Sequence, residues 1–318
     1  MMHRILNTIG EAFDPKAKEI LNGLGKVDYL IPSQEQLLKK IGDYDIAVIG
    51  LGLTFNAEVL NKATKLKFLV TATTGLDHID LIAAEKKGIK VLSLKGEDDF
   101  LNTITGTAEL ALGLMLSLAR NIPEARSSVL KGEWNREAYK GHSLYGKTLG
   151  VVGLGRLGKM MARYGEGLGM KVIFSDPQAE APNLNHKKVS FEQLLAESDV
   201  ISVHVHLSSE TEFMLDTTAF GKMKKSAYLI NTSRGKIVNE TDLIDALENG
   251  RLAGYGTDVL DGEISFADND CSDHPLVKYA QNNKNVLILP HIGGMTFESR
   301  SDTDIFIAQK LAKHATGN

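Results

Sequence analysis

The sequence is poor in cysteine and in proline, with one cysteine, Cys271, and seven prolines in 318 residues. A single cysteine cannot form a disulfide within the chain, which is typical of a protein from a reducing compartment. Cys271 stands in an acidic stretch with no neighbouring basic residue that would favour its thiolate. We therefore expect neither a disulfide scaffold nor a catalytic thiol.

The sequence also lacks an excess of charge and a long apolar run. The formal net charge is −4, so a nucleic-acid or membrane-surface partner is not expected. The longest apolar stretch, 110–119, is shorter than the ~20 residues of a membrane-spanning helix and predicts a helix buried between layers or between subunits. The first residues contain no apolar run of the kind found in signal peptides. We expect a cytoplasmic protein.

Short apolar runs alternate with amphipathic stretches along most of the chain. In the first part, strands are expected over 4–8, 45–49, 68–72 and 90–93, and helices over 15–24, 33–41, 57–63 and 80–87. A long helix over 103–120 and a polar connection with Trp134 follow. The second series has strands over 148–152, 171–175, 200–205, 227–231, 252–257 and 286–289, with helices that include 191–196 and 240–247. This alternation predicts parallel sheets with helices on both faces.

Three glycines, Gly153, Gly155 and Gly158, follow the first strand of the second series and open a helix. In a dinucleotide-binding turn, the first glycine makes the turn, the second lets a pyrophosphate approach the backbone, and the third lets helix and strand pack closely. The helix N-terminus then offers N–H groups and a partial positive charge. A glycine-rich turn of some other α/β protein is the alternative, but the flanking strand and helix favour the dinucleotide site.

Asp176 ends the next expected strand, where an acidic residue can bind the ribose of a dinucleotide. A carboxylate there would repel a 2′-phosphate, and no basic residue occurs over 177–179. The sequence therefore predicts NAD rather than NADP.

The length of the chain suits two domains, and the dinucleotide series begins in its middle. A terminal helix over 296–313 has no strand of its own and is expected to pack on the first domain. We predict an α/β protein with two Rossmann-like, doubly wound parallel-sheet domains separated by a cleft. The first, discontinuous domain (1–98 and 292–318) would bind substrate, and residues 99–291 would form the NAD-binding Rossmann domain.

Three ionisable residues, Arg234, Glu263 and His291, each follow a different expected strand of the second series. Because ligands bind beyond the carboxyl ends of parallel strands, we expect these side chains to converge. Arginine can hold a substrate carboxylate, histidine can transfer a proton near neutral pH, and a carboxylate can orient the histidine. Each residue alone could be an ordinary loop residue. Together, behind the glycine turn, they favour hydride transfer between a nicotinamide and a 2-oxo acid.

Several stretches resemble the D-isomer-specific 2-hydroxyacid dehydrogenase family, which includes phosphoglycerate, D-lactate, glyoxylate and hydroxypyruvate enzymes. These stretches are 74–80, 152–158, 198–204, 231–235, 256–263 and 290–294. The resemblance extends over nearly the whole chain. It implies an NAD-dependent dehydrogenase in which Arg234 binds substrate and His291, partnered by Glu263, is the general acid/base.

The resemblance also implies binding residues and an assembly. The cofactor would be bound by Gly153, Gly155, Arg156, Leu157, Gly158, Asp176, His204, Thr232, Ser233, Asp258 and Gly293. The substrate would be bound by the backbone of Thr73, Thr74 and Gly75 together with Arg234. No metal is implied. A homodimer is expected, with the helix over 103–120 and the segment around Trp134 as its interface.

Four features depart from the family pattern. His206 occupies a position where the family usually has proline, Thr73 one where glycine is common, and Ile264 another proline position. We interpret His206 as a substitution at the rim of the cofactor site. The acidic stretch 265–273 is interpreted as a solvated loop.

The loop over 50–54 bears on the substrate. Phosphoglycerate-type members resemble one another in having an arginine there, whereas this loop contains no basic residue. A phosphate requires charge-assisted donors, so the sequence favours a small or apolar 2-substituent, as in glyoxylate, pyruvate or a branched oxo acid. Three alternatives stay open: a phosphoglycerate dehydrogenase-type activity, a non-catalytic NAD(H)-sensing, corepressor-like protein, and a paralogue without activity.

Overall fold

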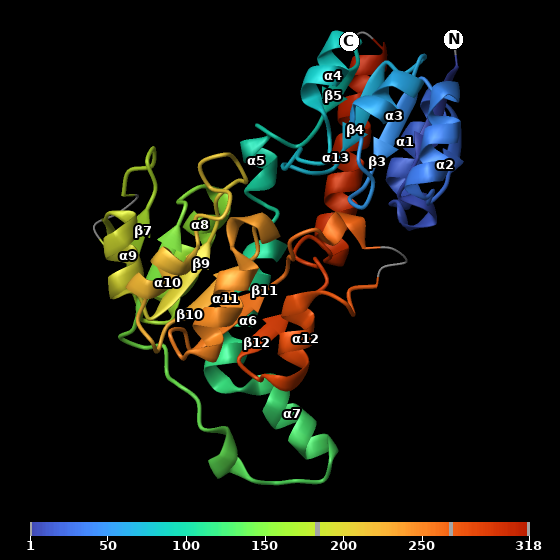
Figure 1. The fold of residues 1–318 in the computed structure, drawn as a ribbon. Helices are drawn as coiled ribbons and strands as arrows, with labels where there is room; N and C mark the ends of the chain where they lie inside the picture. Colours follow the sequence, from blue (N-terminus) through green and yellow to red (C-terminus); the bar gives the residue numbers. More distant parts are fainter. Residues whose placement is uncertain (1, 182–184, 267–269, 317–318) are drawn as a thin grey trace. The chain divides into compact units, whose positions relative to one another are not determined.

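The computed structural model describes residues 2–181, 185–266 and 270–316 (Figure 1). The chain divides into two compact units. Unit 1 comprises Met1–Ile104 and Met295–Asn318, and unit 2 comprises Thr105–Gly294. These divisions fall a few residues after those expected from the sequence. Each unit contains a parallel sheet, which confirms the predicted fold class of two Rossmann-like α/β units.

The sheet of unit 1 has five parallel strands in the order β2-β1-β3-β4-β5. This is a doubly wound order, in which the chain first extends the sheet to one side and then to the other. The strands are β1 (His3–Asn7), β2 (Gly25–Tyr29), β3 (Ile46–Ile49), β4 (Phe68–Thr71) and β5 (Lys90–Leu92).

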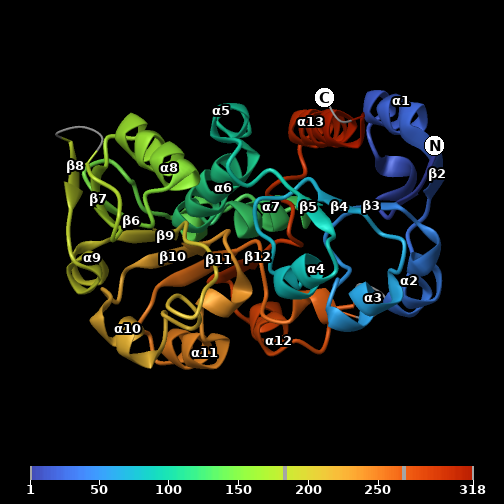
Figure 2. The ribbon, with the colours of Figure 1, turned by 90° about the horizontal axis from the view of Figure 1, so that it is seen from above.

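Helices cover both faces of this sheet (Figure 2). One face carries α1 (Pro15–Leu24) and α13 (Phe297–Thr316), and the other carries α2 (Gln34–Lys40), α3 (Ala57–Lys62) and α4 (Leu81–Lys86). A short helix, α5 (Asp98–Leu101), follows β5. The terminal helix α13 packs on α1, β4 and β5 and buries Ile307 and Leu311 in the core of unit 1.

Strand β2 is absent from the sequence-based prediction. Its five residues include two charged side chains and are mostly half-buried, because β2 lies at the edge of the sheet. A side chain is excluded at its first residue, Gly25, since a Cβ atom there would lie 1.9 Å from the carbonyl oxygen of His3. What marks this strand is therefore a glycine that lets its backbone lie close to β1, and not a run of apolar residues.

The sheet of unit 2 has seven parallel strands in the order β12-β11-β10-β9-β6-β7-β8. They are β6 (Thr148–Val152), β7 (Lys171–Ser175), β8 (His186–Lys188), β9 (Val200–Val203), β10 (Tyr228–Asn231), β11 (Gly254–Thr257) and β12 (Val286–Ile288). The prediction of six strands is wrong by one. Strand β8 was missed because it is a three-residue edge strand with two exposed lysines.

The first strand of unit 2, β6, pairs with both β7 and β9. The chain therefore reverses its direction of winding between β6 and β9, where a doubly wound fold binds its dinucleotide. One face of the sheet carries α6 (Gly106–Arg120) and α8 (Arg156–Gly167). The other carries α9 (Phe191–Glu197), α10 (Thr217–Lys222), α11 (Glu240–Glu248) and α12 (Pro275–Asn282) (Figure 2).

Helix α6 contains the apolar stretch that the sequence analysis considered too short to cross a membrane. Among the described residues, the run Asp98–Arg120, of 23 residues, is long and apolar enough to cross a membrane by length and composition alone, a test that a buried core helix also passes. In the structure, α6 contacts α8, β10 and β11, and it buries Leu114, Met115 and Leu118. These contacts are those of a core helix.

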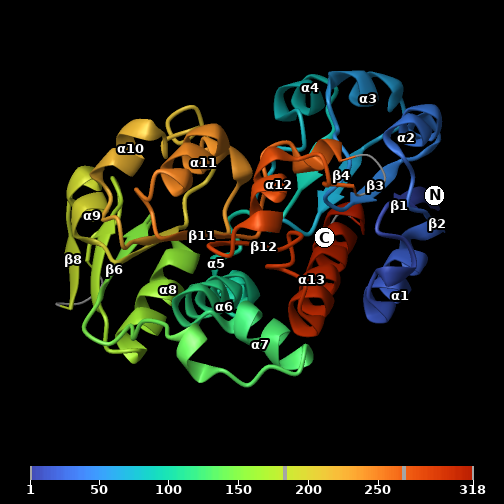
Figure 3. The same cartoon turned by 60° about the horizontal axis from the view of Figure 1, so that its bottom comes forward.

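Helix α7 (Ile122–Leu130) follows α6 directly, and the segment after it loops outward before the chain enters β6 (Figure 3). The connection between α6 and α7 is Asn121, whose φ of 52° lies in the left-handed region that asparagine tolerates better than most residues. Trp134, in the outer segment, is 90% exposed.

Candidate active site

The three glycines of the turn after β6 differ in how closely other atoms approach them. Gly153 has a φ of +86°, and a Cβ atom there would lie 2.7 Å from the carbonyl oxygen of His204. A Cβ atom at Gly158 would lie 2.0 Å from the carbonyl oxygen of Gly153. At Gly155, by contrast, no described atom lies within 4 Å of the Cβ position. The first and third glycines are thus required by packing, whereas the second faces the space that a pyrophosphate needs.

Helix α8 begins at Arg156, directly after Gly155, so the backbone N–H groups of Arg156 and Leu157 lie in its first turn. N–H groups in the first turn of a helix have no acceptor within the helix, and this position suits an anion. The turn therefore fits a phosphate group beside Gly155.

Asp176 lies directly after β7 and ties this strand end to the glycine turn. Its Oδ2 accepts a hydrogen bond from the Leu154 N–H, and its Oδ1 accepts from the N–H groups of Gln178 and Ala179, all at 2.8 Å. Burial opposes ionisation of Asp176, but these three donors outweigh it and hold its pKa below the ordinary value. The site thus presents an ionised carboxylate next to the glycine turn.

Three further residues of the predicted cofactor site lie at the ends of β9 and β10. The Nε2 of His204 lies 2.8 Å from Ser202 Oγ, and burial lowers the pKa of His204 to about 4, so the imidazole is neutral at pH 7. Ser233 Oγ donates to the carbonyl oxygen of Val203 at 2.8 Å. The hydroxyl of Thr232 is buried and has no hydrogen-bond partner among the described residues. It is therefore free to bind a ligand at this edge.

His291 and Glu263, predicted from separate strand ends, are in direct contact. His291 Nδ1 lies 2.6 Å from Glu263 Oε1, with side chains 30% and 22% exposed respectively. Burial alone would lower the pKa of His291, but the carboxylates of Glu263 and Asp258 outweigh it and raise the pKa above the ordinary value. The positive charge of Arg234 acts in the opposite direction. Because Glu263 occupies Nδ1, Nε2 is the nitrogen left to exchange a proton with a substrate.

The backbone of His291 is held in an uncommon conformation by Asp258. His291 has a φ of 54°, in the left-handed region that non-glycine residues rarely adopt. The carboxylate of Asp258, which is 1% exposed, accepts hydrogen bonds from the N–H groups of Ile292 and Gly293 at 2.7 Å each. Burial raises the pKa of Asp258 even though these two donors lower it. Asp258 is predicted from the sequence as a cofactor-binding residue, and its bonds to the backbone after His291 are seen only in the structure.

Arg234 follows β10, and the residue after it, Gly235, packs against a neighbouring turn. A Cβ atom at Gly235 would lie 2.1 Å from the carbonyl carbon of Leu260 and 2.2 Å from the nitrogen of Asp261. The turn that carries Arg234 therefore touches the backbone of the turn that carries Glu263. The guanidinium donates to the Ser233 carbonyl oxygen at 2.8 Å. Arg234, Glu263 and His291 thus gather at one edge of the sheet of unit 2.

The predicted substrate loop, Thr73–Gly75, belongs to unit 1 and follows β4. Thr73 Oγ1 lies 3.0 Å from Thr71 Oγ1 and donates to the Gly75 carbonyl oxygen at 2.8 Å. The threonine that stands where glycine is common therefore braces the loop. In the described part of the chain, no acceptor is found for the backbone N–H groups of Thr74 and Gly75.

The other departures from the family pattern lie at the surface. His206 is exposed, and its carbonyl oxygen accepts a hydrogen bond from Thr211. Ile264 is also exposed, in a single helical turn over Glu263–Ser265. Residues 267–269 of the acidic stretch lie outside the described residues, and Cys271 is half-buried.

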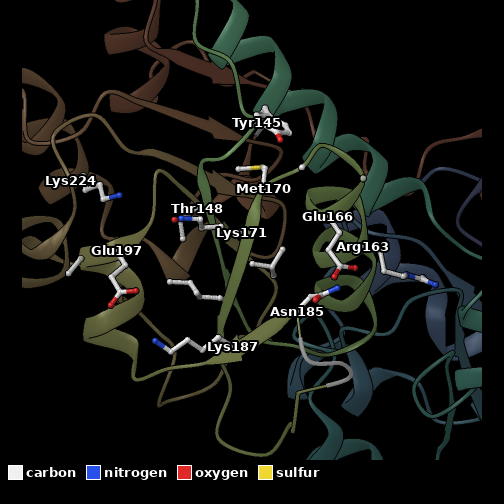
Figure 4. A pocket seen from close by; sticks show the side chains of 15 residues that line it. Tyr145, Thr148, Arg163, Glu166, Met170, Lys171, Asn185, Lys187, Glu197 and Lys224 are labelled. Carbon is white, nitrogen blue, oxygen red and sulfur yellow. The ribbon is translucent and has the colours of Figure 1, made fainter.

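A separate hollow of about 1260 Å³ lies at the opposite edge of the sheet of unit 2 (Figure 4). Its lining includes Thr148 and Lys171, the first residues of β6 and β7, together with Lys187 and Lys224. Since β6 ends at the glycine turn, this hollow is a strand length away from the residues described above. Lys224 is already paired with Asp199 at 3.0 Å.

The fold and the site define a dinucleotide-binding α/β protein with a paired histidine and glutamate at the same edge of the sheet as the glycine turn. The family model for the D-isomer specific 2-hydroxyacid dehydrogenase, NAD binding domain, matches residues 112–293. The chain belongs to the D-isomer specific 2-hydroxyacid dehydrogenase family, which confirms the resemblance, and residues 112–293 lie in the NAD-binding domain of that family.

Relatives with several names share this family. The chain is 34% identical over 318 residues to a D-3-phosphoglycerate dehydrogenase of Methanocaldococcus jannaschii, covering 99% of this chain and 55% of the relative. It thus spans about half the length of that relative. It is 38% identical over 297 residues to a glyoxylate reductase of Thermococcus litoralis, covering 90% of this chain and 85% of the relative. A D-lactate dehydrogenase structure from Aquifex aeolicus, complexed with NAD and lactic acid, has a TM-score of 0.87 at 28% identity and covers 99% and 96% of the two chains.

Proposed function

We propose that this protein is an NAD-dependent oxidoreductase that interconverts a small 2-oxo acid and the D-2-hydroxy acid by hydride transfer. The observation that carries the proposal is the 2.6 Å contact between His291 Nδ1 and Glu263 Oε1 at the carboxyl edge of the sheet that also bears the glycine turn. The names of the relatives, which include a glyoxylate reductase and a D-lactate dehydrogenase, agree with this reaction class.

The cofactor contacts follow from the glycine turn. The N–H groups at the start of α8 would bind the pyrophosphate, and Asp176 would accept hydrogen bonds from the adenosine ribose. Thr232, Ser233 and His204 would line the rest of the site, with Asp258 and Gly293 at its nicotinamide end. When bound, NADH supplies the hydride.

The proton is assigned to His291. In the direction of reduction, its Nε2 would donate a proton to the carbonyl oxygen as the carbonyl carbon receives the hydride, and in oxidation the same nitrogen would accept it. Glu263 holds the ring through Nδ1 and stabilises the imidazolium. Arg234 would bind the substrate carboxylate or polarise the ketone.

Unit 1 is proposed to be the substrate-binding domain and unit 2 the NAD-binding domain. The free N–H groups of Thr74 and Gly75 suit a carboxylate oxygen. In the loop over 50–54, Leu51 is exposed and no basic residue occurs. We therefore favour a 2-oxo acid with a small or apolar 2-substituent, such as glyoxylate, pyruvate or a branched oxo acid.

Two alternatives stay open, and a specific observation favours the first. A phosphoglycerate dehydrogenase-type activity is favoured by the names of several relatives. A non-catalytic NAD(H)-sensing, corepressor-like protein could keep every residue of the site. NADH oxidation measured over glyoxylate, hydroxypyruvate, pyruvate, phosphohydroxypyruvate and branched oxo acids separates the three. Fastest turnover of phosphohydroxypyruvate would favour the first alternative, and tight NADH binding without turnover of any acid would favour the second.

We further infer a cytoplasmic homodimer without a nucleic-acid or membrane partner. The support is a groove of about 690 Å³ along α6 and α7, whose apolar lining includes Leu116, Val129 and Leu130. Trp134 is exposed in the segment that follows α7. Light scattering of the wild type and of Leu130→Glu tests the assembly, because a charge in a dimer interface should release monomers.

A further inference from the structure

A second carboxylate–histidine pair lies behind the pair formed by Glu263 and His291. Glu240 is the first residue of α11, and His274 precedes α12 as its N-cap residue. Their side chains are 12% and 10% exposed, and His274 Nε2 lies 3.2 Å from Glu240 Oε2. Nothing in the proposed reaction uses either residue.

The two pairs hold one turn from its two sides. Leu260 N–H donates to Glu263 Oε2 at 3.1 Å, and the next N–H in the chain, that of Asp261, donates to Glu240 Oε1 at 3.1 Å. His274 Nε2 also lies 3.2 Å from the carbonyl oxygen of Asp261. Because a carbonyl oxygen can only accept, this geometry places a proton on Nε2 of His274. Consecutive peptide groups are thus fixed by Glu263 on one side and by Glu240 with His274 on the other.

The same turn is confined on a third side by Gly235. The backbone of Gly235 packs so closely on Leu260 and Asp261 that a side chain at position 235 has no space. The turn can therefore move only away from Gly235, and the hydrogen bonds of Glu240 and His274 oppose that movement. Any loosening would carry Glu263 Oε1 away from His291 Nδ1.

We propose that Glu240, held by His274, is a positioning residue that fixes the Leu260–Glu263 turn and so keeps Glu263 against His291. It acts through the turn and touches neither substrate nor cofactor. The inference rests on the proposed function, in which His291 transfers the proton.

Several charged groups surround the turn and His291. Burial and the nearby carboxylates of Asp261 and Glu263 raise the pKa of Glu240 to about 7, although the Asp261 N–H acts in the opposite direction. The groups that face His291 are Glu263, Asp258 and Arg234, of which Glu263 contributes most to raising its pKa. Loss of the Glu263 contact should therefore lower the pKa of His291.

The test compares Glu240→Ala with Glu240→Gln. Alanine removes the acceptor of the Asp261 N–H, whereas glutamine keeps an oxygen there. The imidazole of His291 is titrated by NMR, with His291→Ala to assign its signal. In Glu240→Ala we expect the pKa of His291 to fall by on the order of half a unit or more and kcat for reduction to fall on the order of 10- to 100-fold, with NADH affinity unchanged. Glu240→Gln should recover most of both.

The matched control is Asp242→Ala on the same helix. Asp242 accepts the Thr217 N–H at 2.9 Å, which lies at the start of α10 and not at the turn. This variant removes a comparable bond and should leave the titration of His291 unchanged. A folded Glu240→Ala protein with wild-type titration of His291 overturns the proposal.

If Glu240→Ala does not fold, His274→Ala decides. It leaves Glu240 in place and should lower the pKa of His291 in the same direction by less, so an unchanged titration again overturns the inference. The NMR titration needs no substrate. Failure of the wild type to reduce any 2-oxo acid would contradict the proposed function alone, while the titration would still test the positioning role of Glu240.

Discussion

The Oδ2 atom of Asp258 accepts a hydrogen bond from the backbone N–H of Gly293 at 2.7 Å, and its Oδ1 accepts at the same distance from Ile292. A buried carboxylate thereby fixes the two peptide groups that follow His291. A Cβ atom at Gly293 would lie only 3.0 Å from Asp258 Oδ2, so glycine suits the approach. These two bonds fix the backbone directly after His291, whose φ of 54° lies in the left-handed region.

Asp258→Asn is the substitution that tests this relationship. One of its amide positions becomes a donor and faces a backbone N–H, which leaves a buried donor without an acceptor. We expect the free energy of unfolding to fall by about 1–3 kcal/mol, and kcat to fall more than the affinity for NADH. Chemical denaturation and steady-state kinetics measure the two effects. Wild-type stability together with wild-type kcat would show that the hydrogen bonds from Asp258 to Ile292 and Gly293 contribute to neither property.

Alanine substitutions at two glycines of the turn should affect two different properties, stability and NADH affinity. Gly158→Ala places a Cβ atom 2.0 Å from a backbone oxygen and should destabilise unit 2 by about 1–3 kcal/mol. Gly155→Ala enters open space at a φ of −68° and should leave stability unchanged. Its expected effect is a loss of NADH affinity on the order of tenfold, because the methyl group occupies the pyrophosphate position. Thermal melting and fluorescence titration with NADH read the two properties separately.

Asp176 should set the preference between cofactors. Asp176→Ala removes the acceptor of the ribose hydroxyls and the charge that repels a 2′-phosphate. We expect the affinity for NAD to fall on the order of tenfold, and that for NADP to fall less or to rise. The ratio of kcat/KM values with NADH and NADPH measures this. An unchanged ratio would mean that Asp176 does not contact the ribose.

Removal of the imidazole should separate chemistry from binding. In His291→Ala we expect turnover to fall on the order of 10²- to 10⁴-fold, with NADH still bound at wild-type affinity. Equilibrium fluorescence and NADH consumption measure the two. Substantial residual turnover would rule out His291 as the general acid.

The pH dependence follows from the raised pKa of His291. The ordinary value is 6.5, and reduction requires the protonated ring, so its rate should fall as pH rises through the higher value of the folded protein. In Glu263→Gln this fall in rate should occur at lower pH, because the main group that raises the pKa of His291 is lost. The contribution of His291 to stability has the same sign: it is complete below the unfolded value of 6.5 and is lost as pH rises through the folded value. Rates of reduction over a pH series, with matched denaturation curves, test both.

The sequence predicts those parts of the fold and the site that consist of residues adjacent in the chain. The glycine turn, Asp176 and the strand ends that carry Arg234, Glu263 and His291 are recognisable from short patterns, because residue type and flanking elements are adjacent in the chain. The edge strands β2 and β8 could not be found in this way, since their few residues are polar or half-exposed. An edge strand is defined by its neighbour and not by its own apolar run.

The hydrogen bonds that hold the turns of the candidate site also could not be predicted from the sequence. Asp258 and Gly293 are 35 residues apart, and Asp261 and Glu240 are 21 apart. Such bonds join side chains to backbone groups of distant turns, so neither partner carries a pattern of its own. Gly235 appears in sequence as an ordinary turn glycine, and only the structure shows that it packs against Leu260 and Asp261.

The position of His291 near the division of the chain has one further consequence. Unit 2 ends at Gly294, three residues after the histidine, and the chain then enters the part that belongs to unit 1. Because Asp258 anchors Ile292 and Gly293 inside unit 2, the imidazole is mechanically a part of that unit. It keeps its distance from Glu263 and from the glycine turn whatever course the backbone takes beyond Gly294.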